Sequence, residues 1–430
     1  MSPGTILNPM TSYTIPYGRA SLSCEIPDRC LSELIALAPN PGVDDPALAV
    51  SDALDNLLGD VRWADFTDVW SVAVAINDKT RPVPHQHLLP PLLARLEGLG
   101  LPPEKITLII ATGTHPPMGE DAYTAVLPQS IIDRYPIICH DTDDTDSLVN
   151  LGETSRGTPV WINRQYVDAD LRIVVGNIEP HQFQGFSGGV KSASIGLAGR
   201  ATVNHNHAMM TDAKAKLGHY DYNPTRQDVE EMGRMIGVHI ALNAILNDKK
   251  AIVKVVAGVP TAVMATGIPL AKSICQADVP GQYDLVIASP GGHPKDINVY
   301  QTQKGLAHAT LVTKPGGTVI LVAACPEGTG SRGYERWVKE RQSNEDVLAQ
   351  FAQEGFRVGP HKAFQIARDA TRVNVLLVSD MEPDFVRQLL LKPVMSLQDA
   401  VNTAVSKLPP SARIGVMPKA NATIPLLKDS

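Results

Sequence analysis

Two histidines, His115 and His181, follow expected strands and could transfer protons in a reaction. His115 lies in ATGTHPP (111–117) and His181 in EPHQFQGFSGGVK (179–191), and each segment follows an apolar, β-branched run. An imidazole titrates near neutral pH, so it can act as an acid and as a base. A lone histidine is more often a structural residue. Because these histidines follow expected strands, a catalytic role is here about as well supported as a structural one.

An aspartate and an arginine three residues apart follow a third apolar run, in INDKTRPVP (76–84). Asp78 can hold a hydroxyl group, and Arg81 can bind a carboxylate or phosphate through two parallel hydrogen bonds. A structural salt bridge in a proline-rich turn explains the same pair equally well. The spacing alone leaves both interpretations open.

A glycine-rich turn follows His181 and ends at a lysine, in the order Ser187, Gly188, Gly189, Val190, Lys191. Such a turn opening a helix is expected to offer free backbone N–H groups to a phosphate. It is not a Walker A loop, because the pattern GxxxxGK[ST] is absent. The turn favours a phosphate-binding or covalent role for Lys191 over that of a surface lysine.

Two further histidines, His205 and His207, flank an asparagine in VNHNHAMM (203–210). In a loop or strand both could reach one metal ion, whereas on a helix they would not share a face. A zinc-type site would need a third ligand, such as His115 or His181. The two residues alone do not decide between a metal site and a structural role.

A weaker candidate lies further along the chain, in SPGGHPKDINVYQTQKGLAHA (289–309). Gln301 and Lys304 have the spacing of one helix face and could bind a carboxylate from the opposite side of a cleft. An ordinary exposed helix is the simpler interpretation of this segment.

The elements that must position these residues are short apolar runs separated by helical patterns. Such continuous runs are typical of strands covered on both faces, and their alternation with helices predicts parallel-sheet α/β units. We expect an α/β protein of two domains, residues 1–270 and 271–430, each a mostly parallel sheet with flanking helices, with the active site in the cleft between them. The runs are VWSVAVAI (69–76), KITLIIAT (105–112), LRIVVGN (171–177), YDLVIAS (283–289), TVILVAAC (318–325) and VNVLLVS (373–379).

The composition narrows the function classes. The chain has 430 residues, 43% of them hydrophobic and 19% charged, which is ample for a folded core. A formal net charge of -7 and 5% aromatic residues argue against nucleic-acid binding. Five scattered cysteines, an N-terminus unlike a signal peptide and the lack of a membrane-length apolar run predict a reduced, cytoplasmic protein.

Taken together, the motifs resemble the lactate racemase family, the nickel-pincer-nucleotide-dependent 2-hydroxyacid racemases and epimerases. The resemblance rests on DKTRP (78–82), GTHP (113–116), EPHQFQGFSGGVK (179–191), NHNH (204–207) and YQTQK (300–304). Family members commonly carry a basic residue after GTH, where this chain has Pro116. The resemblance therefore implies a 2-hydroxy acid as substrate without naming lactate.

The resemblance also implies a cofactor, a pyridinium-3,5-bisthiocarboxylic acid mononucleotide that holds nickel, bound by the N-terminal domain while the C-terminal domain closes the substrate cleft. Lys191 matches the attachment point of that cofactor, and His207 matches the protein's nickel ligand, with His205 as the fallback. The remaining matches are His115 and His181 as acid and base; Asp78, Ser187, Gly188 and Gly189 at the cofactor; and Arg81, Gln301 and Lys304 at the substrate.

The reaction that this implies is inversion of C2 through reversible hydride transfer, because removing the C2 proton beside a carboxylate is difficult. One histidine would take the hydroxyl proton while the hydride leaves C2, which gives a flat keto acid. Return of the hydride to the other face of C2, with a proton from the second histidine to the oxygen, would give the opposite configuration. The implied partners are a small 2-hydroxy acid and the enzymes that make the cofactor. Two alternatives stay open: a zinc-dependent hydrolase using His115, His181 and His207, and a non-catalytic nickel- or nucleotide-binding protein.

Overall fold

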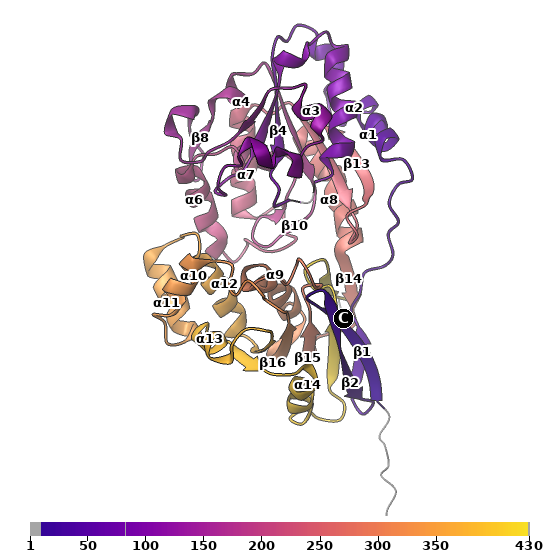
Figure 1. Cartoon of the computed structure of the whole chain (residues 1–430), viewed down its shortest axis with the longest axis vertical. Coiled ribbons are helices and arrows are strands. Elements are labelled where there is room, and N and C mark those ends of the chain that lie inside the picture. Colours follow the sequence, from indigo (N-terminus) through magenta and orange to yellow (C-terminus); the bar gives the residue numbers. More distant parts are fainter. Residues whose placement is uncertain (1–9, 82, 429–430) are drawn as a thin grey trace, which may run out of the picture. The chain divides into compact units, whose positions relative to one another are not determined.

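The computed structural model describes residues 10–81 and 83–428, and these form two compact units (Figure 1). The central unit comprises Pro39–Ile274, and the terminal unit combines the described part of Met1–Ala38 with Cys275 onward. The expectation that residues 1–270 form one domain is therefore wrong for the N-terminal segment. Strand β3 (Leu31–Leu34) pairs in parallel with β19 (Arg413–Met417), and the periodicity of a short edge strand does not show which distant strand it will join.

The central unit is built on a six-stranded sheet in the order β13-β12-β9-β4-β5-β6. All neighbouring pairs are parallel except β12 with β13, which are antiparallel. The strands are β4 (Val72–Asn77), β5 (Ile106–Ala111), β6 (Ile137–Cys139), β9 (Leu171–Asn177), β12 (Ile240–Leu246) and β13 (Ile252–Gly258).

Alternate residues of β4 show how this sheet is covered. Val72, Val74 and Ile76 pack in one core with the helices α1 (Pro46–Asp55) and α2 (His85–Gly98). Ala73 and Ala75 face another core, shared with α7 (Pro224–Ile236) and α8 (Pro260–Cys275). A strand that buries both faces reads as a continuous apolar run, which explains why these strands stand out in the sequence.

The other elements of the central unit are short and lie mainly in the connections. They are α3 (Gln129–Ile132), α4 (Arg164–Asp168), α5 (Lys191–Ser194), α6 (Arg200–Ala208), β7 (Leu148–Glu153), β8 (Pro159–Asn163), β10 (Pro180–His181) and β11 (Gly185–Phe186), together with 3-10 turns at Trp63–Phe66, Pro103–Lys105, Glu120–Ala125, Thr145–Ser147 and Met209–Thr211.

The terminal unit is built on a second six-stranded sheet, in the order β18-β17-β16-β15-β19-β3, and every neighbouring pair in it is parallel. Its other strands form two separate pairs, β1 with β2 and β14 with β20. The strands not yet introduced are β1 (Met10–Tyr17), β2 (Ala20–Pro27), β14 (Gln276–Val279), β15 (Tyr283–Ala288), β16 (Thr313–Val322), β17 (Asn374–Val378), β18 (Lys392–Val394) and β20 (Ile424–Leu427).

Helices and a hairpin cover this second sheet. One core holds side chains of α9 to α12, and the other holds side chains of the β1–β2 hairpin and of α14. Within the described residues no helix is both long and apolar enough to cross a membrane. The prediction of an α/β fold with two mostly parallel sheets is confirmed. The helices are α9 (Val299–Thr310), α10 (Arg332–Val338), α11 (Asn344–Glu354), α12 (Pro360–Ala370), α13 (Pro383–Gln388) and α14 (Leu397–Val405).

Candidate functional site

The loops after β4 and β5 bring an aspartate and a histidine together. Because β4 and β5 are parallel neighbours, their carboxyl ends meet at one edge of the sheet. Nδ1 of His115 lies 2.8 Å from Oδ2 of Asp78. The tight turn before His115 depends on Gly113, whose φ of 58° is the left-handed region that glycine tolerates best and whose N–H bonds the carbonyl of Gly196.

Asp78 is buried and ionised. Burial by itself would raise its pKa, but hydrogen bonds from His115 and Thr80 and the positive charge of Arg81 lower the pKa below its ordinary value. The Thr80 hydroxyl donates to Oδ1 of Asp78 at 2.7 Å and so occupies the second carboxylate oxygen. The close hydrogen-bonding partner of Asp78 is thus His115, which the sequence did not link to it.

This contact determines where His115 carries its proton. A carboxylate only accepts hydrogen bonds, so Nδ1 of His115 is the donor. In the neutral ring the lone pair is then on Nε2. The His115 side chain is 43% exposed, whereas that of Asp78 is 5% exposed, so the ring can meet a ligand while its anchor stays buried.

His181 lies in the β10–β11 hairpin and is held differently. The backbone N–H of Gln184 donates to Nδ1 of His181 at 3.2 Å, so the neutral ring in this form carries its proton on Nε2. Its ring also packs edge-on against Phe183, with centroids 4.7 Å apart. The two histidines are therefore not equivalent, because one is fixed by a carboxylate and the other by a backbone amide.

Phe183 extends this row of rings to His207. The centroids of the Phe183 and His207 rings are 4.9 Å apart, again edge to face. Burial, followed by the positive charges of Lys191 and Arg81, lowers the pKa of His207 to about 3. His207 is therefore neutral at physiological pH, which is the protonation state that a metal-binding imidazole requires.

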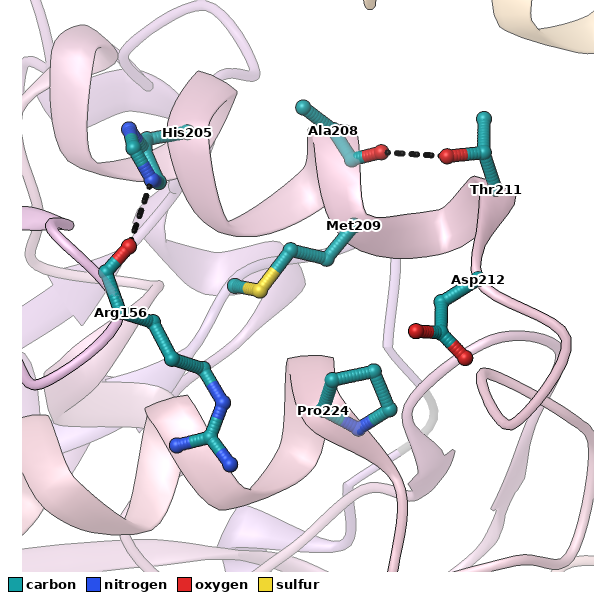
Figure 2. A pocket seen from close by; sticks show the side chains of 7 residues that line it. All are labelled: Arg156, His205, Ala208, Met209, Thr211, Asp212 and Pro224. Carbon is teal, nitrogen blue, oxygen red and sulfur yellow. Dashed lines mark hydrogen bonds between the residues drawn. The ribbon is translucent and has the colours of Figure 1, made fainter.

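The other candidate ligand, His205, lies in different surroundings. Both residues are on helix α6, where a separation of two turns the side chains apart. Nε2 of His205 contacts the carbonyl oxygen of Arg156 at 3.2 Å, and the ring lines an open pocket of about 520 Å³ with Met209 and Asp212 (Figure 2). The helix thus separates the two histidines, and His207 has Lys191 and Arg81 as charged neighbours.

The glycine-rich turn is present, but most of its amides already have partners. Ser187 N–H bonds the carbonyl of Glu179, Gly189 N–H bonds Oδ1 of Asn243 at 2.7 Å, and Lys191 N–H bonds the carbonyl of Gly188. The expectation that this turn offers free N–H groups to a phosphate is wrong for these three residues. Helix α5 behind it has only four residues.

The glycines of the turn are needed for close packing. Gly188 has a φ of 93° and Gly189 a φ of 55°. A Cβ at Gly188 would lie 2.7 Å from Cγ1 of Ile178, and one at Gly189 would lie 2.7 Å from Cγ of Met264. The turn therefore packs closely against Ile178 and helix α8. At its end, Nζ of Lys191 lies 3.5 Å from Oγ of Ser187.

A buried ion pair that was not predicted from the sequence holds this turn. Arg226 is fully buried in α7 and donates to Glu230, to the carbonyl of Phe186 and to that of Gly188. Tyr220 contributes its hydroxyl to the same Glu230 oxygen at 2.8 Å. An arginine and a glutamate four residues apart usually form an exposed helix pair, so their spacing gave no signal of burial.

In the terminal unit, Gln301 and Lys304 lie on helix α9 and contact one another. Nζ of Lys304 donates to Oε1 of Gln301 at 3.0 Å. Asn298 caps the helix by accepting from the Gln301 N–H, which places Gln301 in the first turn. The simpler interpretation, an ordinary exposed helix, is wrong, since residues such as Gln303 and His308 of α9 are buried.

The zinc-hydrolase alternative needs three protein ligands around one ion. Across residues 10–81 and 83–428, no group of three or more His, Cys, Asp or Glu side chains is placed to hold a metal ion. The nitrogen Nδ1 of His115 contacts Asp78, and that of His181 contacts Gln184. The geometry does not support the zinc alternative.

Comparison with known proteins covers both units. The model of the lactate racemase N-terminal domain matches residues 17–218, and that of the C-terminal domain matches residues 279–424. The lactate racemase of Thermoanaerobacterium thermosaccharolyticum is 28% identical over 427 residues, covering 96% of this chain and 99% of that protein. The lactate racemase of Lactiplantibacillus plantarum is 28% identical over 419 residues, covering 95% of this chain and 98% of that protein.

Solved structures agree with the sequence matches. The lactate racemase apoprotein from Thermoanaerobacterium thermosaccharolyticum superposes with a TM-score of 0.89 at 26% identity, over 97% of this chain and 100% of that one. A protein from Thermotoga maritima shares the fold, with a TM-score of 0.66 at 18% identity over 91% of this chain and 100% of that one. With both domain models matched in order and together spanning most of its length, this chain belongs to the lactate racemase family.

Proposed function

We propose that this protein is a racemase or epimerase that inverts C2 of a 2-hydroxy acid, lactate or a larger relative, with a nickel-pincer nucleotide as its cofactor. Family membership supports the racemase activity. The contact between Nδ1 of His115 and the Asp78 carboxylate, at 2.8 Å, is the observation that carries the acid–base assignment. It holds an imidazole in a defined tautomer at the carboxyl edge of a parallel sheet, where α/β proteins place ligands.

The residues around His207 fit such a cofactor. A neutral imidazole is a good ligand for nickel, and the pKa of about 3 keeps His207 neutral. In the cofactor-free protein, the positive charges of Lys191 and Arg81 that contribute to this low pKa favour the approach of an anionic nucleotide. We assign His207 as the nickel ligand in preference to His205.

Lys191 is assigned as the covalent attachment point of the cofactor, with Asp78, Ser187, Gly188 and Gly189 beside it. The glycines act by letting the turn pack closely, and the Ser187 hydroxyl lies within reach of the lysine amine. The enzymes that make the cofactor are required partners in this scheme. When bound, the cofactor supplies a hydride acceptor for the C2 hydrogen.

The chain's own residues move the protons. Nε2 of His115 accepts the hydroxyl proton of one enantiomer, and Asp78 stabilises the imidazolium that results. His181 serves the opposite enantiomer. To accept a proton, its ring has to break the hydrogen bond from the Gln184 N–H to Nδ1. Both the Nδ1–H tautomer and the imidazolium carry a proton on Nδ1, which then cannot accept from that amide. The two directions of the reaction therefore place different demands on the protein.

Substrate binding is assigned to Arg81, Gln301 and Lys304. A guanidinium and an ammonium attract the substrate carboxylate, and Lys304 is oriented by its bond to Gln301. Pro116, next to His115, carries no charge, so it contributes no ion pair to a carboxylate. A side chain longer than the methyl group of lactate is consistent with that neutral neighbour.

A chiral assay tests this proposal. The cofactor-loaded protein is incubated with single enantiomers of lactate, malate, aryl and sugar-derived 2-hydroxy acids, and the products are separated on a chiral column. Inversion of at least one acid is expected, and only in protein that contains both nickel and cofactor. No inversion across the panel by fully loaded protein contradicts the proposed function.

A further inference from the structure

A buried asparagine, Asn206, sits between His207 and a buried aspartate. Its side chain is fully buried, and so is that of Asp228 on helix α7. Oδ1 of Asn206 lies 3.1 Å from Nδ1 of His207, and Nδ2 of Asn206 lies 2.9 Å from Oδ2 of Asp228. Asn206 thus connects the proposed nickel ligand to the interior of the central unit.

The neighbours of Asn206 decide which way its amide points. Nδ2 faces the Asp228 carboxylate and the Thr225 carbonyl, each at 2.9 Å, and both of these groups only accept hydrogen bonds. Oδ1 faces Nε2 of Gln184, which donates at 3.0 Å. A flipped amide would set donors against donors and acceptors against acceptors in the protein interior, where a polar group without a hydrogen-bond partner is strongly unfavourable.

Asp228 is itself firmly held. The hydroxyls of Thr154 and Thr158 donate to its two oxygens at 2.6 and 2.9 Å, and Asn206 supplies a third donor. Three donors fix the orientation of the Asp228 carboxylate. Because this fixed acceptor faces Nδ2 of Asn206, the fold also determines the orientation of the Asn206 amide. The oxygen that His207 meets is therefore always an acceptor.

From this we propose that Asn206 is a positioning residue that sets the tautomer of His207. Its Oδ1 accepts from Nδ1–H, so the lone pair of the ring lies on Nε2, the nitrogen that would bind nickel. Metal-binding histidines commonly donate their second nitrogen to such an acceptor, and loss of that partner weakens metal binding roughly 10- to 100-fold. The inference rests on the proposed function in taking His207 as the nickel ligand.

Gln184 extends the same network to the acid–base machinery. Its side chain donates to Oδ1 of Asn206, and its backbone N–H donates to Nδ1 of His181. The position of the β10–β11 hairpin is thereby tied to the residue that orients His207. Asn206 was not singled out in the sequence, where it is only the residue between two histidines.

The tautomer is tested directly, without cofactor. The full chain, labelled with ¹⁵N-histidine and free of cofactor, is examined by ¹H–¹⁵N NMR, with the His207 signals assigned by their loss in His207→Gln. Protonated and unprotonated ring nitrogens differ widely in ¹⁵N shift, so the result is unambiguous. We expect a proton on Nδ1 and none on Nε2, and a proton on Nε2 in the wild-type protein overturns the inference.

Variants separate positioning from general destabilisation. Asn206→Leu removes the acceptor and is expected to lower nickel retention in cofactor-loaded protein about 10- to 100-fold relative to wild type. Thr158→Val is the matched control, because it removes a buried hydrogen bond from the same network without touching His207. Equal loss of nickel in both variants reduces Asn206 to a structural residue and contradicts the proposal.

A paired exchange keeps the test decisive where Asn206→Leu does not fold. In the double variant Asn206→Asp with Asp228→Asn, a carboxylate oxygen replaces the amide oxygen opposite Nδ1 of His207, and an amide and a carboxylate still face one another. The exchange gives up the hydrogen bonds to the Thr225 carbonyl and from the Thr158 hydroxyl, but it keeps the acceptor that faces His207. The Nδ1–H tautomer and nickel retention are expected to return toward wild-type values. An Nε2–H tautomer in this variant counts against the role of the acceptor.

The outcomes also separate this inference from the proposed function. Suppose that Asn206→Leu disturbs the Nδ1–H tautomer but the loaded wild-type protein holds no nickel. His207 is then not a metal ligand, whereas the orienting contact from Asn206 is still supported. Full nickel retention and racemisation with His207 in the Nε2–H form leaves the function standing and overturns the inference.

Discussion

The Nδ1 atom of His115 and the Oδ2 atom of Asp78 lie 2.8 Å apart, across the loops that follow two neighbouring parallel strands. The carboxylate is buried and the imidazole is half-exposed. This arrangement orients the ring, favours one tautomer and stabilises the positive charge that the ring gains when it accepts a proton. It joins two residues that the sequence suggested separately.

Asp78→Asn should strongly lower kcat while leaving the fold intact. The amide removes the negative charge that stabilises protonated His115 and no longer specifies which ring nitrogen carries the proton, so kcat is expected to fall roughly 100-fold or more. Thr80→Val is the control, since it removes the hydroxyl that donates to Asp78 but keeps the contact between Asp78 and His115. Steady-state kinetics and circular dichroism check both variants, and equal, small losses contradict the assigned role of Asp78.

Removal of either acid–base histidine should stop turnover. His115→Ala and His181→Ala are each expected to lower kcat by about 10²- to 10⁴-fold, because each ring handles the proton of one enantiomer. Nickel and cofactor content should stay at the wild-type level in both. Wild-type rates in the two variants, measured from each enantiomer in turn, would remove these residues from the mechanism.

Lys191 should be the residue that retains the cofactor. Lys191→Ala removes the amine, and Lys191→Arg keeps a positive charge beside His207 without a nucleophilic amine. Intact-protein and peptide mass spectrometry are expected to show the cofactor adduct on the wild-type peptide and on neither variant. An adduct that persists in Lys191→Arg places the attachment elsewhere.

The buried pair Arg226 and Glu230 should stabilise the turn that leads to Lys191. Arg226→Met leaves the Glu230 carboxylate buried without its partner and is expected to lower the free energy of unfolding by about 3–5 kcal/mol. The double variant with Glu230→Leu should be more stable than Arg226→Met, because no unpaired charge remains. Urea unfolding compares the three proteins, and a double variant less stable than Arg226→Met disproves this account of the pair.

Acid should destabilise the central unit through His85. Burial lowers the pKa of His85 to about 4, below the value of about 6.5 in an unfolded chain. Between these values the unfolded chain binds a proton that the folded protein does not, so the free energy of unfolding decreases as the pH falls. From pH 7 to pH 5 this contributes about 2 kcal/mol.

The variant His85→Gln checks this contribution. It should lose less stability than the wild type between pH 7 and pH 5 in urea unfolding, because the titrating group is gone. The same decrease in both proteins shows that other groups account for the pH dependence.

The strands were predictable because both of their faces are buried. The run KITLIIAT contains β5, and VWSVAVAI contains β4, with residues on alternate sides entering two different cores. The membership of β3 in the far sheet was not predictable, because a four-residue edge strand has no pattern that selects its partner.

The candidate site was predictable as a set of residues and not as a set of contacts. The end of each strand indicated Asp78 and His115, but only the parallel pairing of β4 and β5 makes them partners. The spacing of His205 and His207 allowed both to be metal ligands. The structure shows that they lie on helix α6, where residues two apart point in different directions. The amides of the Ser187 turn looked free because the sequence does not show that Asn243 and the Glu179 carbonyl reach them.

The hydride route is tested most directly by the fate of the C2 hydrogen. Cofactor-loaded protein is incubated in D₂O with one enantiomer of an acid that it inverts, and the product is analysed by mass spectrometry and NMR. We predict that the inverted product keeps its original C2 hydrogen, because the hydrogen never exchanges with solvent. Deuterium at C2 of the product would instead show proton abstraction and contradict the proposed mechanism.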